Sequence, residues 1–205
     1  MENKHIIINV GRQLGSGGHI IARMLAKDFN AKFYDREILN LAAKESGFSE
    51  KIFEQNDEKK GFIRGLFNMA APHVSGVYES GFSQENLFKF QSDAIRKAAE
   101  KGSCVFVGRC ADYVLRDFEN VVNIFITASM HDRVEQILNK QNVEPPEAKR
   151  MILQAESKRA AYYNYYTGKK WGHAESYDLC VNTSFLGMEE TEKMVADFIR
   201  KRFGL

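Results

Sequence analysis

An apolar run that ends in a glycine-rich loop constrains the fold of this chain more than any other feature. Residues 6–22 read IIINVGRQLGSGGHIIA, and an amphipathic segment follows at once, with Ile21 and Leu25 four residues apart. A buried strand, a glycine loop and a helix N-terminus form an anion site, because consecutive backbone N–H groups face the ligand. The residues therefore predict a phosphate-binding loop formed by Gly15, Ser16, Gly17, Gly18 and His19. The alternative is a tight turn that only needs small residues.

The same loop lacks the cation that phosphate-binding loops normally carry. Gly18 stands where lysine is expected, and His19 and Ile20 follow in place of the serine or threonine that holds Mg²⁺. Arg12, in the preceding turn, is the nearest replacement for the lysine. Ser16 is a possible but poorly placed ligand for Mg²⁺.

Strands and helices alternate along the 205 residues, which suit a single domain. Continuous apolar strands separated by helices predict a doubly wound α/β fold, in which a five-stranded parallel sheet carries helices on both faces. Residues 47–90 have a weaker pattern and are interpreted as a helical insert beside the binding site. We expect strands near 5–10, 32–34, 103–107, 121–127 and 178–182, and helices near 17–29, 35–44, 87–101, 130–140, 145–165 and 189–202.

Composition excludes several classes of protein. The net charge of +2 argues against general nucleic-acid binding, which usually needs a large basic excess. No stretch approaches the ~20 apolar residues of a membrane span, and the first apolar run is too short for a signal peptide, so a cytoplasmic protein is expected. Cys104 and Cys180 lie in apolar runs and are expected to be buried thiols. The histidines show no ligand spacing with cysteines or carboxylates, so no structural zinc site is expected.

Ligands of such a fold bind at the carboxyl ends of the strands, where several charged residues are expected to meet. Arg12 follows the first strand, Asp35 and Arg36 the second, and Arg109 the third. An arginine at this edge suits a phosphate, although Arg109 could instead form an ion pair with Asp112. Asp35 could accept hydrogen bonds from a sugar or base or orient an attacking oxygen, or it could simply cap a helix.

Residues 150–176 are interpreted as a lid-like segment over the site. Four tyrosines at 162, 163, 165 and 166 precede a GKKWG turn, a pattern typical of a flap; the alternative is a hydrophobic edge or a homodimer contact. Arg150 and Arg159 are nine residues apart and should project from different faces of a helix.

Five pieces of the sequence, in order, resemble the cytidylate kinase-like proteins of the P-loop nucleoside monophosphate kinase group. They are GRQLGSGGHIIA, FYDREIL, VFVGRCADYVL, VNIFITASMHDRVEQI and YDLCVNTSFLGMEE. The resemblance implies transfer of the γ-phosphoryl group of ATP to a nucleoside monophosphate such as CMP, with Mg²⁺. It implies that residues 15–19 wrap the ATP phosphates, that Arg109 and Asp112 lie at the acceptor phosphate, and that Asp35 and Arg36 lie near the acceptor nucleoside.

The resemblance also implies that Arg159 is a lid arginine, which neutralises charge on the transferring group, in a pattern that pairs it with Glu156. Arg12, Arg109 and Arg159 would then supply the positive charge that phosphoryl transfer needs. Two alternatives stay open. The chain could bind a nucleotide or anion without turnover, or its aromatic flap could serve assembly while the glycine loop is a relic.

Overall fold

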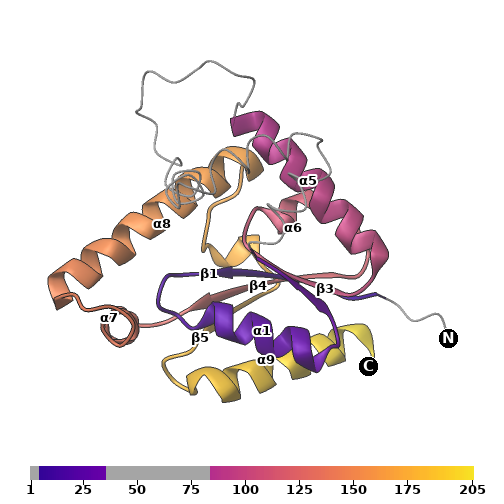
Figure 1. The fold of residues 1–205 in the computed structure, drawn as a ribbon. Helices are drawn as coiled ribbons and strands as arrows, with labels where there is room; N and C mark the ends of the chain where they lie inside the picture. Colours follow the sequence, from indigo (N-terminus) through magenta and orange to yellow (C-terminus); the bar gives the residue numbers. More distant parts are fainter. Residues whose placement is uncertain (1–4, 36–83) are drawn as a thin grey trace, which may run out of the picture.

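The structure is a computed structural model that describes residues 5–35 and 84–205 of the chain. Strands and helices alternate through this part, as Figure 1 shows. The elements are β1 (Ile7–Arg12), α1 (Gly18–Asp28), β2 (Lys32–Tyr34), α5 (Gln84–Lys101), β3 (Cys104–Val107), α6 (Ala111–Val114), β4 (Val121–Thr127), α7 (Met130–Leu138), α8 (Pro145–Thr167), the 3₁₀ turn η1 (Ala174–Ser176), β5 (Leu179–Asn182) and α9 (Gly187–Phe203).

The five strands form one parallel sheet in the order β2-β3-β1-β4-β5. The first strand lies at its centre, where Val10 is in register with Val107 of β3 on one side and Ile124 of β4 on the other. Because every strand runs the same way, all carboxyl ends lie at one edge. The glycine loop therefore starts from the middle of that edge.

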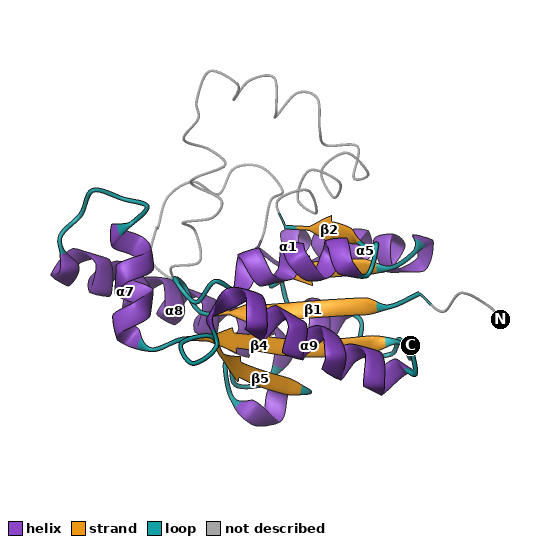
Figure 2. Cartoon of the chain, turned by 90° about the horizontal axis from the view of Figure 1, so that it is seen from below, coloured by secondary structure: helices purple, strands orange, loops and turns teal. Residues whose placement is uncertain are grey.

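Helices cover both faces of the sheet. The helices α1 and α9 lie on one face (Figures 1 and 2), and α5 and α6 pack on the other. Alternation along β1 serves both layers: Ile8 and Val10 belong to the core beneath α1 and α9, whereas Ile7 belongs to the core beneath α5 and α6. A smaller cluster joins α7 to α8. The doubly wound parallel fold predicted from the sequence is confirmed.

The structure differs from the sequence-based expectations at Cys180 and at one short helix. Cys104 is buried as expected, but Cys180 is exposed, because side chains alternate along β5 and Val181 points into the core while Cys180 points to the opposite face. The short helix α6 was not predicted. The helix expected over 35–44 and most of the expected insert over 47–90 lie outside the described residues. None of the described helices is long and apolar enough to cross a lipid bilayer.

Candidate active site

The glycine loop connects β1 to α1 at the carboxyl edge of the sheet. Gly15 and Gly17 both have positive φ, of 82° and 76°, so the loop curls back on itself before α1 begins. Within the described part of the chain, no hydrogen bond uses the backbone N–H of Gly15, Ser16 or Gly17. Donors that face no protein acceptor beside a helix N-terminus are what an anion site requires.

Ser16 points into the protein and does not suit Mg²⁺. Its side chain is buried, its hydroxyl donates to the carbonyl of Gln13 at 3.0 Å, and the N–H of Gly18 donates to that hydroxyl at 3.4 Å. Ile20, at the position where a metal-binding hydroxyl is expected, has none. Within 5–35 and 84–205 no group of three His, Cys, Asp or Glu side chains is placed to hold a metal ion. The loop itself therefore offers Mg²⁺ no side-chain ligand of the usual kind.

Arg12, the last residue of β1, occupies the space that a side chain at position 18 would need. A Cβ atom built on Gly18 would lie 2.6 Å from Cβ of Arg12 and 3.0 Å from Cβ of Ile126. The guanidinium of Arg12 reaches across to the end of β3, where its Nη1 occupies the place of a Cβ built on Gly108. Real Cβ atoms do not approach other Cβ atoms so closely, so position 18 needs glycine, and at Gly108 the φ of 74° favours glycine.

Two more arginines come to the same place from different elements. Arg159 on α8 donates from Nη1 to the backbone carbonyl of Arg12 at 2.8 Å. Arg109 follows β3 at the start of a turn in which it and Cys110 have φ of 62° and 55°. Non-glycine residues adopt these left-handed angles at some energetic cost, which is often found at functional turns.

Burial and mutual repulsion act on all three guanidiniums. Burial, and to a smaller degree the charges of Arg159 and Arg109, together lower the pKa of Arg12 to about 9, while Asp35 opposes the shift. Burial also lowers the pKa of Arg109 and of Arg159. All three stay protonated at neutral pH, and together they form a concentrated positive charge beside the glycine loop.

Asp35 and His19 complete the cluster. Asp35 directly follows β2, and its Oδ2 lies 2.9 Å from Nε2 of His19 in the first turn of α1. The ring of His19 packs edge-on against Phe33, with the centroids 5.4 Å apart. Arg36 lies outside the described residues, as does the helix that Asp35 was expected to cap. The structure therefore brings together Arg12, Arg109, Arg159, Asp35, His19 and the glycine loop.

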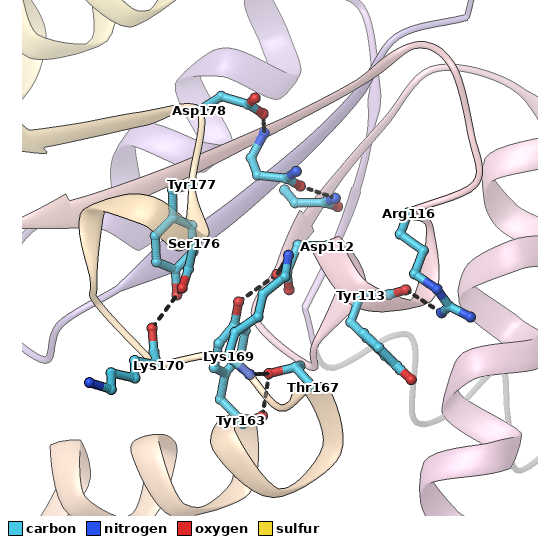
Figure 3. Close-up of polar contacts among 12 residues, drawn as sticks. Asp112, Tyr113, Arg116, Tyr163, Thr167, Lys169, Lys170, Ser176, Tyr177 and Asp178 are labelled. Carbon is cyan, nitrogen blue, oxygen red and sulfur yellow. Dashed lines mark hydrogen bonds and ion pairs between the residues drawn. The ribbon is translucent and has the colours of Figure 1, made fainter.

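Asp112 is attached to the lid-like segment instead of to Arg109. Tyr163 donates its hydroxyl to Oδ2 of Asp112 at 2.6 Å, and Nζ of Lys169 lies 3.7 Å from the same oxygen, as Figure 3 shows. The carboxylate is buried, and burial raises the pKa of Asp112, although the Tyr163 hydrogen bond acts against the shift. The alternative of an ion pair between Asp112 and Arg109 does not describe these contacts.

The lid-like segment also holds the glycine loop through a pair that sequence reasoning did not assign. Arg133 on α7 is 4 % exposed; it forms an ion pair with Glu156 on α8 and donates from Nε to the carbonyl of Leu14 at 2.9 Å. Glu156 thus supports the loop indirectly. Arg150 is exposed and pairs with Glu147, so it lies apart from Arg159 as expected. The spacing between Glu156 and Arg133 carries no local signal, because 23 residues separate them.

The aromatic residues of the lid-like segment are packed in the structure. Tyr166 stacks on Phe88 of α5 with the centroids 4.0 Å apart, and Trp171 meets Phe125 of β4 edge-on at 5.2 Å. Tyr163 is buried, whereas Tyr165 is 72 % exposed. These contacts therefore join α8 to α5 and join the turn after α8 to β4.

Comparison with known proteins agrees with this architecture. A cytidylate kinase from Methanopyrus kandleri is 24 % identical over 194 residues, covering 91 % of this chain and 89 % of its own. A second, from Sulfurisphaera tokodaii, is 21 % identical and covers 95 % of each chain. Both identities are low.

Solved structures give the same fold. An uncharacterized protein from Eubacterium ventriosum superposes with a TM-score of 0.73 at 27 % identity, covering 95 % of this chain and 98 % of its own. A shikimate kinase from Bacteroides thetaiotaomicron superposes with a TM-score of 0.54 at 15 % identity, covering 98 % of this chain and all of its own, a likeness of fold alone. Residues 7–185 match the sequence profile of the cytidylate kinase-like family, and the chain belongs to that family.

Proposed function

We propose that this protein is an ATP-dependent phosphotransferase that acts on a nucleoside monophosphate such as CMP or on another small acceptor. The observation that carries the proposal is the convergence of Arg12, Arg109 and Arg159 beside a glycine loop in which the N–H groups of Gly15, Ser16 and Gly17 have no acceptor among residues 5–35 and 84–205. Phosphoryl transfer needs alignment and positive charge more than covalent help from the protein. Membership of a kinase-like family supports the same reaction class.

In this proposal Gly15 to His19 bind the phosphates of ATP through their backbone. Arg12 supplies the charge of the missing lysine, and its stem, packed over Gly18, is why no lysine stands there. Arg109 binds the acceptor, and Arg159 on α8 neutralises charge on the phosphoryl group that is transferred. Mg²⁺ accompanies ATP, but no step is assigned to it, because Ser16 is turned inward and the described residues show no ligand set for a metal.

The first test is ATP binding by isothermal titration calorimetry, for the wild type and for Arg12→Ala. Because a hydrogen bond to a charged group contributes about 1.5–3 kcal/mol, loss of Arg12 should raise Kd by about 10- to 150-fold. The matched control is Arg150→Ala, which removes an exposed arginine on α8 and should leave Kd unchanged. Equal affinities of Arg12→Ala and the wild type would contradict the role of Arg12.

The second test is turnover. ADP release should be detected with CMP or a panel of small acceptors and should disappear in the Arg109→Ala, Arg159→Ala double variant. The second candidate is a nucleotide-binding module without turnover, which the missing lysine and metal-binding hydroxyl favour. It predicts saturable ATP binding with no ADP formed, and Mg²⁺-dependent phosphoryl transfer would exclude it.

A further inference from the structure

Two carbonyl groups of the glycine loop are held by side chains from distant elements. Nε of Arg133 on α7 donates to the carbonyl of Leu14 at 2.9 Å, and the hydroxyl of Thr183, directly after β5, donates to the carbonyl of Ser16 at 3.0 Å. Both donor side chains are buried. The direction of these two carbonyls is therefore set from outside the loop.

Each of these contacts also sets the direction of an N–H group. In a planar trans peptide, the C=O of one residue and the N–H of the next point in opposite directions. Because the carbonyl of Leu14 is turned towards α7, the N–H of Gly15 is turned away from α7. Because the carbonyl of Ser16 is turned towards Thr183, the N–H of Gly17 is turned away from it. Neither N–H has an acceptor among the residues that the structure describes, so both can meet a ligand.

Arg133 is fixed at both ends. Its main chain packs directly on the loop, where its carbonyl oxygen lies 2.6 Å and its Cα 2.9 Å from the position of a Cβ built on Gly15. At the other end its guanidinium forms an ion pair with Glu156 on α8. A guanidinium presents its donors in a planar fork, so one side chain can hold the carboxylate and the loop carbonyl together.

Thr183 is fixed by the end of the neighbouring strand. Its N–H donates to the carbonyl of Thr127, the last residue of β4, at 3.0 Å, and its hydroxyl lies 3.3 Å from the same oxygen. A hydroxyl has only one proton to donate, and the shorter contact is the one to Ser16. The edge of the sheet thus determines how this part of the loop is oriented.

We propose that Arg133 and Thr183 are positioning residues for a phosphate group bound by the glycine loop. Arg133 aims the N–H of Gly15 at the phosphate, and Thr183 aims the N–H of Gly17. Each acts through the main chain of the loop and not by touching the phosphate. Donors that are oriented before binding need no reorganisation, so they hold an anion more tightly than donors that rotate freely. The inference rests on the phosphate-binding step of the proposed function and not on turnover.

Two substitutions of Thr183 separate its hydroxyl from its bulk. Thr183→Val removes the hydroxyl and keeps the shape, whereas Thr183→Ser keeps the hydroxyl. The probe is inorganic pyrophosphate, and its Kd is measured by isothermal titration calorimetry. Thr183→Val should raise this Kd about 2- to 12-fold, which corresponds to the loss of one neutral hydrogen bond, and Thr183→Ser should stay within about twofold of the wild type.

The matched control for the valine substitution is Thr191→Val. It removes another buried threonine hydroxyl, which donates to the main-chain carbonyl of Gly187 on α9, and it should leave the Kd unchanged. A wild-type Kd in Thr183→Val would overturn the role of Thr183.

Two substitutions of Arg133 separate the donor at Nε from the charge. Arg133→Lys keeps the charge but has a methylene group at the position of Nε. Arg133→Gln can place its amide nitrogen there, and it is combined with Glu156→Gln so that no carboxylate is left without its partner. Both proteins keep the net charge of the wild type. The glutamine pair should bind pyrophosphate within about twofold of the wild type, whereas Arg133→Lys should lose about 2- to 12-fold. A wild-type Kd in Arg133→Lys, or a larger loss in the glutamine pair, would overturn the role of Nε.

Amide NMR identifies which N–H group is affected, which a general loss of stability would not do. In the ¹⁵N-labelled wild type, saturation with pyrophosphate should shift the amide signals of Gly15 and Gly17. Thr183→Val should reduce the shift of Gly17 and retain that of Gly15, and Arg133→Lys should do the reverse. Equal loss of both shifts in each variant would overturn the inference.

The wild type separates this inference from the proposed function. Binding of neither pyrophosphate nor ATP would overturn both. ATP that binds but is never cleaved would overturn the proposed function alone, because the orientation of the N–H groups could still be measured with pyrophosphate.

Discussion

The fit between Arg12 and Gly18 can be tested by adding a single methyl group. An alanine at position 18 would place its Cβ 2.6 Å from Cβ of Arg12 and 3.0 Å from Cβ of Ile126. Both atoms are attached directly to strand backbones at the centre of the sheet, where Arg12 is paired with Ile126, so neither can move without the strand. Overpacking of this kind costs about 1–3 kcal/mol.

Helix propensity acts in the opposite direction to the clash, so the sign of the stability change depends on which effect is larger. Gly18 is the first residue of α1, and in open space an alanine there would stabilise the helix by up to about 1 kcal/mol. The clash is the larger effect, so Gly18→Ala should lower the free energy of unfolding by about 1–2 kcal/mol. Urea denaturation followed by circular dichroism measures the difference.

Measuring Gly18→Ala in two Arg12 variants identifies the atom that causes the clash. Arg12→Ala retains Cβ, so Gly18→Ala should cost the same there as in the wild type. Arg12→Gly removes Cβ and leaves only the looser contact with Ile126, which the gain in helix propensity offsets. The added cost should then fall to within about 0.5 kcal/mol of zero, with a coupling energy of about 1–2 kcal/mol in the double-mutant cycle. A Gly18→Ala protein as stable as the wild type, or more stable, would refute the reasoning that the arginine stem fills the space of the missing lysine.

Three further predictions concern the neighbouring contacts. Burial raises the pKa of Asp112, so the native state binds the proton more tightly than the unfolded state, and stability falls as pH rises from about 4 through the raised pKa. Tyr163→Phe removes the hydroxyl that donates to Asp112 and raises that pKa further, so its cost in urea denaturation, about 1–3 kcal/mol, should be larger at pH 8 than at pH 5. The cost of Tyr165→Phe, at an exposed tyrosine, should not change with pH. Glu156→Gln leaves the buried Arg133 without its anion and should lower the free energy of unfolding by about 3 kcal/mol, whereas Glu147→Gln, in an exposed pair, should leave it unchanged in the same assay. A thiol reagent should modify one cysteine rapidly in the native protein, identified by mass spectrometry as Cys180, and three after unfolding; rapid labelling of Cys104 or Cys110 would contradict the burial of those thiols.

The sequence predicted the framework of the fold because the framework depends on local patterns. Apolar runs rich in β-branched residues, such as 121–127, indicate buried strands, and the glycines at 15 and 17 indicate a loop before the helix. The sheet edge at which Arg12, Asp35 and Arg109 meet then follows from the parallel topology. The strands, the glycine loop and the sheet edge can be predicted without knowing which distant side chains are in contact.

The partners of Asp112 and Cys180 could not be predicted from local patterns. Asp112 meets Tyr163 across 51 positions of sequence, and no periodicity connects them. Cys180 sits in an apolar run, but its burial depends on whether another element covers the face of β5 to which it points, and within the described residues only the face of Val181 is covered. The short helix α6 begins after two residues with left-handed angles, which nothing in their side chains indicates.

The hydrogen bond from Arg159 to the main chain of Arg12 means that α8 reaches the end of β1, from which the glycine loop starts. Three like charges are thus gathered when the chain folds, and their repulsion is a burden on the folded state from the outset. An incoming polyanion relieves that repulsion and needs little rearrangement to do so. In the proposed function, the stability given up in this way places the counter-charges of a nucleotide in position before it binds.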